Sequence, residues 1–161
     1  MAVDMFLKLT NIKGESHDAK HKGEIDVLAW SWAMSNASSA HSGGGAGSGK
    51  VNMGDISITK KVDASSNVLM LSCASGEHIK QADLVVRKHG GKAPLEYIKI
   101  KLEDVLITSV STGGSGGENE LTENVSISFA KISYDYVPQK EDGSGDAPKP
   151  FGWDIKAHQK V

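Results

Sequence analysis

Hydrophobic and polar residues alternate along most of the chain, which is the pattern of half-buried β-strands. In residues 3–10, Val3, Met5, Leu7 and Leu9 alternate with mostly polar side chains. The same pattern predicts further strands at residues 24–35, 51–62, 79–89, 96–110, 121–137 and 151–155. Glycine-rich clusters separate several of these segments and are typical of loops. The pattern therefore predicts about eight strands in an antiparallel barrel or sandwich.

In the predicted strand at residues 121–137, the apolar residues switch from one face of the strand to the other half-way along. Its first half places Val125, Ile127 and Phe129 in one phase, and its second half places Ile132, Tyr134 and Tyr136 in the other. Such a change predicts a bulge, or a strand that passes from one sheet to another. In residues 96–110, by contrast, we expect one face to hold Ile98, Ile100, Leu102 and Leu106.

Residues 63–74 form the one helix that the sequence predicts. Asp63 or Ser65 suits the N-cap, and Gly76 suits the residue that ends the helix. Between them lies a dense apolar set made of Val68, Leu69, Leu71 and Ala74. We therefore expect a mainly β protein, an antiparallel barrel of two packed sheets, with one flanking α-helix.

The segment 24–35 predicts one large apolar face and one small uncharged face. The large face holds Leu28, Trp30, Trp32 and Met34, and two tryptophans in one phase are expected to anchor it in the core. The small face holds Val27, Ala29, Ser31 and Ala33. A face so small and uncharged is unusual against water, so another surface is expected to pack against it or pass by it.

Composition excludes several classes of protein. With 161 residues the chain has the length of one domain, spanning residues 1–161, and no apolar run reaches a membrane-spanning length. Membrane insertion is therefore not expected. The net charge is -2 and no basic stripe is visible, so we do not expect nucleic-acid binding either. Cys73 is the only cysteine, and residues 1–10 lack the features of a cleaved signal peptide.

The search for catalytic chemistry yields two weak motifs. Residues 44–50 (GGAGSGK) fit part of a phosphate-binding loop, but Val51 stands where the magnesium-binding hydroxyl belongs, and a strand follows. His17 and His21 have the spacing of a zinc pair, yet the segment is bracketed by glycines, so a polar surface loop is expected. We therefore predict no enzyme, no cofactor and no metal centre.

Several runs of sequence resemble the Hcp family, the hemolysin-coregulated proteins of the bacterial type VI secretion system. The runs are residues 24–35 (EIDVLAWSWAMS), 55–61 (DISITKK), 87–91 (RKHGG), 104–117 (DVLITSVSTGGSGG), 122–131 (TENVSISFAK), 136–140 (YVPQK) and 151–155 (FGWDI). Together they cover essentially the whole chain. The sequence departs from many members of the family at two places. Ala33 stands where many members have glycine, and Ser66 and Asn67 stand near the start of the helix, where many members have a proline.

The resemblance implies a structural protein that assembles with itself. Six copies would close into a ring, and rings would stack into the tube that a contractile sheath ejects. The implied partners are other copies, the sheath, spike and baseplate proteins, and secreted effectors bound in the lumen. The protein would be assembled in the bacterial cytoplasm and then secreted without a cleaved signal peptide.

Residues for these roles are assigned as hypotheses. For the lumen surface we expect Ser31, with Ala29 and Ala33 beside it. For ring stacking, by analogy with the corresponding loop of the family, we expect Ser42, Gly43, Gly44, Gly45, Gly47 and Lys50. The expected core anchors are Trp30, Trp32 and Phe129.

Two other functions remain open from the sequence. A small-ligand or carbohydrate-binding β-barrel would use Trp153, Tyr134 and Tyr136 as a stacking platform. An enzyme acting through His17 and His21 would require bound zinc. The first alternative predicts a monomer or dimer, and the second predicts a metal, whereas the resemblance predicts a ring of six subunits.

Overall fold

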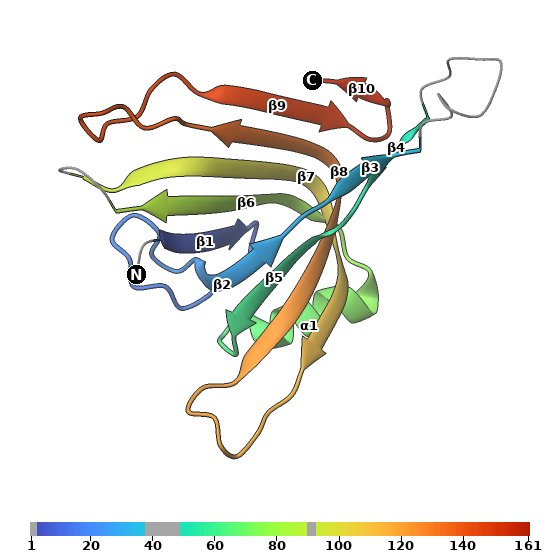
Figure 1. The fold of residues 1–161 in the computed structure, drawn as a ribbon. Helices are drawn as coiled ribbons and strands as arrows, with labels where there is room; N and C mark the ends of the chain where they lie inside the picture. Colours follow the sequence, from blue (N-terminus) through green and yellow to red (C-terminus); the bar gives the residue numbers. More distant parts are fainter. Residues whose placement is uncertain (1–2, 38–48, 90–92) are drawn as a thin grey trace.

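Six strands close into an antiparallel barrel in the computed structural model, which describes residues 3–37, 49–89 and 93–161 (Figure 1). Around the barrel the order is β8 (Thr122–Tyr136), β5 (Ile56–Lys61), β2 (Ile25–Ser31), β1 (Val3–Leu9), β6 (Ile79–Lys88) and β7 (Leu95–Thr112). Pairing of β7 with β8 closes the ring of strands. The prediction of a mainly β barrel with one helix is confirmed.

Strand β8 has different neighbours along its two halves. Its first half pairs with β5, from Lys61↔Thr122 to Ile56↔Ile127. Its second half pairs with β9 (Lys149–Asp154), which carries the short outer strand β10 (Gln159–Lys160). Buried side chains change phase between Phe129 and Ile132. The predicted change of phase is therefore confirmed, but β5, β8 and β9 belong to one continuous sheet, so the strand exchanges neighbours and does not pass to a second sheet.

Strand β7 changes phase at Asp104. This residue has a φ of 54°, in the left-handed region that L-residues rarely adopt. Before it Leu102 is buried, and after it Val105 and Ile107 are buried. Leu106 is only half-buried, so the expectation that it shares a face with Leu102 was wrong. A residue in this conformation interrupts the alternation of inward and outward side chains along an extended strand.

A bulge in β2 shifts its facing in the same way. The register with β5 shifts between Val27 and Ala29. As a result Val27 is buried in the core and Leu28 is 42 % exposed, the reverse of the sequence prediction. Beyond the bulge the predicted faces hold, because Trp30 packs half-buried against the core and Ser31 is exposed.

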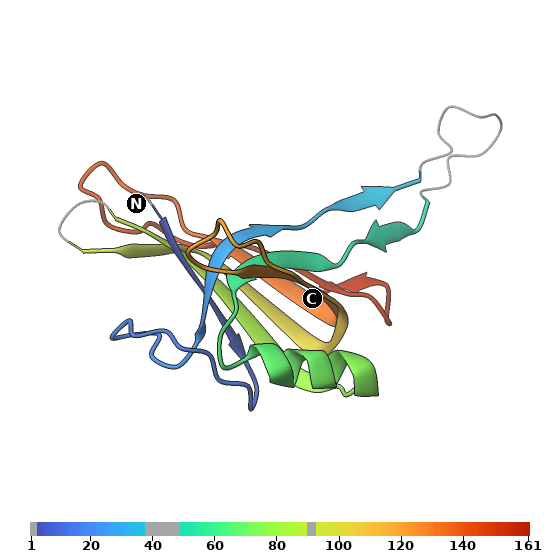
Figure 2. The same cartoon turned by 90° about the horizontal axis from the view of Figure 1, so that it is seen from below.

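The predicted strand at residues 51–62 is interrupted. Its first part, β4 (Val51–Met53), pairs with β3 (Met34–Asn36) in a separate ribbon that projects from the barrel (Figure 2). The break lies at Gly54, whose N–H donates to the carbonyl of Ala33 at 2.9 Å. A Cβ on Gly54 would lie 2.8 Å from that oxygen, so this approach requires glycine.

The helix α1 (Ser66–Ser75) lies beside β7 and covers the barrel on the side opposite the exposed face of β2 and β5 (Figure 2). Ser65 is the N-cap residue, and Gly76, with a φ of 66°, follows the last turn. The predicted helix is thus confirmed, with a start at Ser66. Leu69 is its fully buried anchor, whereas Leu71 is 65 % exposed. No helix in the described ranges is long and apolar enough to cross a membrane.

A fully buried ion pair lies at the end of the barrel next to the helix. Lys60 and Glu123 are direct cross-strand partners, and their side chains are 0 % exposed. The Lys60 ammonium contacts the Glu123 carboxylate and also lies 2.9 Å from Asp63 Oδ1. Ser66 Oγ donates to Glu123 Oε1 at 2.6 Å. The pair thereby connects the first turn of α1 to two barrel strands.

Removing one member of this pair should destabilise the protein strongly. We expect Lys60→Met to lower the free energy of unfolding by about 3–5 kcal/mol, because it leaves the Glu123 carboxylate buried without its cation. The double variant Lys60→Met/Glu123→Leu should recover most of that loss, since an apolar pair needs no charge compensation. Urea denaturation followed by tryptophan fluorescence measures both.

The neighbouring exposed pair provides the control. Lys61 and Glu120 contact each other at 2.7 Å but are 47 % and 62 % exposed. Lys61→Met should therefore leave the unfolding midpoint almost unchanged. If Lys60→Met and Lys61→Met lowered the free energy of unfolding equally, burial of the ion pair would not explain the effect at Lys60.

Candidate functional site

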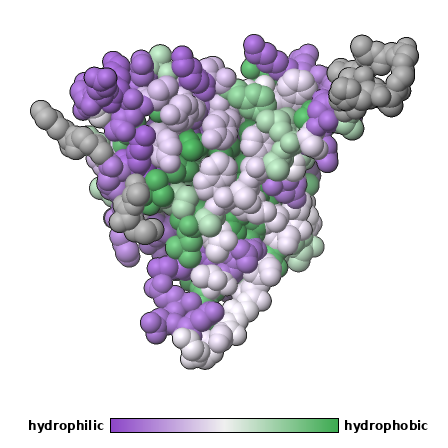
Figure 3. Space-filling view, in the orientation of Figure 1, coloured by the Kyte–Doolittle hydropathy of each residue, from purple (hydrophilic) through white to green (hydrophobic). Residues whose placement is uncertain are grey.

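A face of small uncharged side chains, each exposed or half-buried, extends across four strands of the barrel. The cross-strand registers align two rows over β2, β5, β8 and β7. The first row is Ser31, Ser57, Ser126 and Ser109, and the second is Ala29, Thr59, Asn124 and Ser111. We call these eight residues the small-residue face. Figure 3 shows the centre of this side mainly in pale colours of intermediate hydropathy.

Several polar groups of the small-residue face hydrogen-bond to one another. Thr59 Oγ1 donates to Asn124 Oδ1 at 2.7 Å, and the hydroxyls of Ser57 and Ser126 lie 3.4 Å apart. No member of the face carries a formal charge or a large apolar side chain. Such a surface offers hydroxyl groups to a passing or bound protein without a strong field of either sign and without a large apolar patch.

The structure places the predicted lumen residues on or next to this face. Ala29 and Ser31 belong to it, and Ala33 is exposed just beyond the end of β2. On the reverse side Trp32 packs half-buried against the core, and its ring meets that of Phe129 edge-on at 6.4 Å. Trp30 also packs against the core, in which Phe129 is buried.

Most of the predicted stacking residues lie outside the described ranges. These are Ser42, Gly43, Gly44, Gly45 and Gly47. Lys50 is described, and it is exposed immediately before β4. The projecting ribbon of β3 and β4 therefore carries both ends of this predicted loop.

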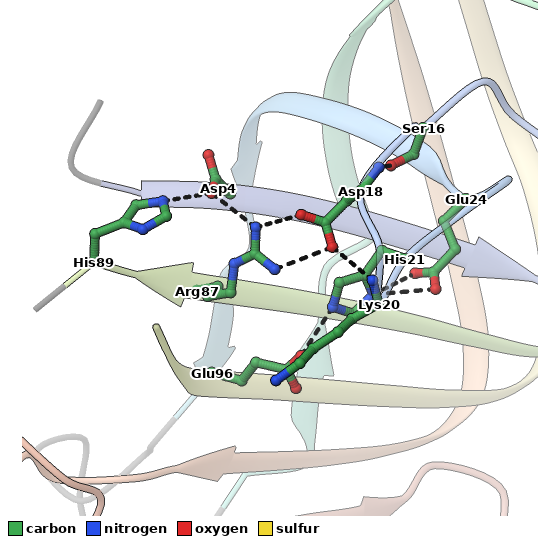
Figure 4. A network of polar contacts seen from close by, with 9 residues as sticks. All are labelled: Asp4, Ser16, Asp18, Lys20, His21, Glu24, Arg87, His89 and Glu96. Carbon is green, nitrogen blue, oxygen red and sulfur yellow. Dashed lines mark hydrogen bonds and ion pairs between the residues drawn. The ribbon is translucent and has the colours of Figure 1, made fainter. Parts of the chain in front are cut away.

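A second polar feature is a half-buried network around Arg87, which is the only arginine in the sequence (Figure 4). Its guanidinium donates to both carboxylate oxygens of Asp18, at 3.1 and 2.6 Å, and to Asp4 at 3.0 Å. It also lies 5.1 Å from the centre of the Phe6 ring. The hydrogen bonds from Arg87 hold the pKa of Asp18 well below its usual range, and they lower the pKa of Asp4 as well.

His21 forms the other half of this network. Its Nδ1 lies 3.0 Å from a Glu24 oxygen, its Nε2 lies 2.8 Å from Glu96, and its ring stacks on Phe6 at 4.3 Å. Each ring nitrogen of His21 therefore lies beside a carboxylate oxygen. Figure 4 shows how the segment bearing His21 is thereby fastened across β1, β6 and β7.

These contacts correct the expectation of a polar surface loop at His17 and His21. His17 is exposed, but His21 is only 7 % exposed and is held between two carboxylates. The two histidines do not lie on a helix, and the described ranges contain no group of three or more potential metal ligands. The network was not predicted because its partners are far apart in the chain. The pairing of β1 with β6, which places Asp4 opposite Arg87, brings them together.

The aromatic residues of the carbohydrate alternative do not form an open platform. Trp153 and Tyr134 pack against the core. Tyr136 is exposed but meets the edge of the Tyr97 ring at 6.5 Å. This arrangement is typical of structural aromatic packing rather than of a concave binding site.

Comparisons with known proteins agree on one family. Residues 6–136 match the family described as "Type VI secretion system effector, Hcp". The chain is 56 % identical to Protein hcp1 of Pseudomonas aeruginosa over 157 residues, 97 % of each chain. Its structure resembles Hcp1 from Salmonella typhimurium, with 40 % identity, a TM-score of 0.82 and full coverage of both chains. It also resembles a type VI secretion system effector from Yersinia pestis, with 37 % identity, a TM-score of 0.75, and coverage of 94 % of this chain and 100 % of the other.

The lowered pKa of Asp18 predicts acid sensitivity of the network. Because the folded-state pKa lies below the unfolded value, the unfolded chain takes up the proton first as the pH falls. The stabilisation is therefore complete at neutral pH and is lost as the pH falls through the folded-state value. We expect Asp18→Asn to lower the free energy of unfolding at pH 7 by about 1.5–3 kcal/mol. The difference from wild type should shrink steadily from pH 5 to pH 2.

Chemical denaturation at a series of pH values measures this profile. Glu141→Gln removes an exposed carboxylate outside the network and should follow the wild-type curve. A constant difference between Asp18→Asn and wild type down to pH 2 would show that ionised Asp18 is not what Arg87 stabilises.

Proposed function

Because the chain belongs to the Hcp family of type VI secretion system proteins, we propose that it is a structural subunit of the secretion tube. Six copies close into a ring, and rings stack into the tube that the sheath ejects together with the spike. Residues 1–161 act as one barrel domain. The tube is assembled in the cytoplasm near the baseplate and leaves the cell carrying effectors. The small-residue face supports this proposal most directly.

The small-residue face has the properties that the lining of a channel needs if many different proteins are to pass through it. A strongly charged lining would retain proteins of opposite charge, and large apolar side chains would trap any exposed apolar segment. Hydroxyl and methyl groups instead allow weak contacts that many proteins can make. We therefore assign Ser31 and Ala29, with the adjoining Ala33, to the lumen and to effector binding.

Ring closure needs two different surfaces of one protomer to meet. The described structure offers unpaired strand edges on the outer strand β10 and on the projecting β3–β4 ribbon. It also leaves Val68 and Leu71 of α1 exposed, at 41 % and 65 %. Apolar side chains of this size are typical of contacts between copies. These features support self-association.

We assign the loop before β4 to contacts between rings. Two observations support this assignment. The corresponding loop in the family reaches towards the adjoining ring, and the β3–β4 ribbon of this chain points away from the barrel (Figure 2). Ser42, Gly43, Gly44, Gly45, Gly47 and Lys50 are the residues concerned.

Deletion of residues 43–47 should separate ring closure from stacking. The wild-type protein is expected to give a six-subunit mass by light scattering and stacked rings by negative-stain microscopy. The deletion should keep the six-subunit mass and lose the stacks, because only the inter-ring contact is removed. A wild-type protein that stays monomeric at high concentration would overturn the proposed function, and stacks formed by the deletion variant would overturn the loop assignment.

Substitution of Ser31 tests the lumen assignment. Ser31→Gln adds a long polar side chain to the small-residue face and should leave the ring mass unchanged. Retention of a co-expressed effector should fall at least fivefold, because the side chain occupies the contact surface. The matched control is Ser75→Gln, at the exposed end of α1 on the other side of the barrel. Equal retention by the two variants would contradict the assignment.

A further inference from the structure

A hollow of about 690 Å³ lies between β1 and the segment that follows it, and lysines surround it. Lys8 comes from β1, and Lys13, Lys20 and Lys22 come from residues 11–24. Leu9 and Ile12, both buried, form part of its floor. We propose that this lysine hollow binds an acidic segment of a partner protein, one that carries an apolar side chain among its carboxylates.

The positive charge of the lysine hollow is not neutralised within the described ranges. None of its four lysines takes part in an ion pair there, although lysines elsewhere on the chain do. The carboxylate that lines the hollow, Glu24, directs both oxygens at His21 Nδ1. The cluster is also opposite in sign to the whole chain, whose net charge is -2. Four lysines that line one hollow create a local field that attracts anions.

The backbone that carries these lysines is firmly fixed. Gly14 N–H donates to the carbonyl of Gly23 at 2.8 Å, and Ser16 N–H donates to that of Glu24 at 3.0 Å. Gly14 itself lies so close to the backbone of Glu24 that a Cβ would come within 2.6 Å of its oxygen. The contacts of Asp18 with Arg87 and of His21 with Glu96 hold the same segment from the other side. The backbone positions from which these lysines extend are therefore fixed, and their flexible side chains can all reach an anion at the hollow.

The composition of the hollow favours carboxylates on a peptide over a phosphate group. Its charges are ammonium groups on flexible stems, and it contains neither an arginine fork nor a helix N-terminus, the two devices that recognise phosphate geometry. Its floor is apolar while its rim is charged, as in a protein-binding surface with a buried centre. Electrostatic complementarity at such a rim mainly raises the rate and specificity of association.

The lysine hollow is separate from the small-residue face. Figure 2 shows residues 10–24 on the same side of the barrel as α1, whereas the exposed face of β2 and β5 is on the opposite side. Binding here therefore goes beyond the proposed function, and a single protomer suffices for it. The two proposals can fail independently.

Fluorescence anisotropy with the full chain and a labelled peptide of alternating glutamate and leucine tests the proposal. We expect saturable binding that weakens as salt is raised from 20 to 200 mM. Lys13→Glu/Lys22→Glu should weaken it at least tenfold. The control Lys149→Glu/Lys160→Glu makes the same change of charge on β9 and β10 and should stay within twofold of wild type. If circular dichroism shows that the first variant is unfolded, Lys13→Gln/Lys22→Gln is used in its place. Its affinity for the peptide is expected to fall at least threefold.

Each other result overturns the proposal. Absence of binding to wild type, or equal losses in the two double variants, would show that no specific site exists. Pyrophosphate that displaces the peptide at equal charge concentration would identify a phosphate site instead. A change in the number of subunits in Lys13→Glu/Lys22→Glu, with peptide binding retained, would place the lysines in a contact between copies.

Discussion

Hydrogen bonding between β7 and β8 along almost their whole lengths is the constraint on which the rest of the architecture depends. These two strands are longer than all the others, and both change facing near the same level, at Asp104 in β7 and between Phe129 and Ile132 in β8. Along this bent strand pair, β8 pairs with β5 in its first half and with β9 in its second half. Because the side chains that point inward change phase at the bend, the core continues along both halves of the β7–β8 pair. The small-residue face lies on the outer side of the half in which β8 pairs with β5.

Charge rather than apolar packing completes the end of the barrel beside α1. Lys60 continues the inward phase of Ile56 and Ile58, and Glu123 continues that of Val125. A buried pair of this kind contributes little net stability compared with apolar side chains, but it penalises any arrangement in which the two charges fail to meet. A shift in the register of β5 against β8 would carry this penalty, and the hydrogen bond from Ser66 joins the helix to the same pair.

Local patterns in the sequence predicted most of the elements, because alternation and helix-ending residues act over a few neighbours. The helix end at Gly76 and the change of phase in β8 are examples. What could not be predicted depends on residues distant in sequence. The bulge after Val27 reflects pairing with β5, and the burial of His21 depends on Glu96. For Lys60 a signal was present, since it shares the phase of Ile58, but a charged residue is not normally assigned to a core. The small-residue face was anticipated only on β2, through Ala29 and Ser31; its continuation onto β5, β8 and β7 required the strand order.

The position of β8 in the chain has a consequence for synthesis on the ribosome. Of the six strands that close the barrel, β8 is the last to be translated, and both β5 and β7 pair with it. Until it emerges, the nascent polypeptide carries two strand edges that lack their native neighbour. Such edges pair readily with those of other unfinished chains on the same message. The barrel therefore closes only after β8 has been translated, and misassembly of the nascent chain is easiest just before that step.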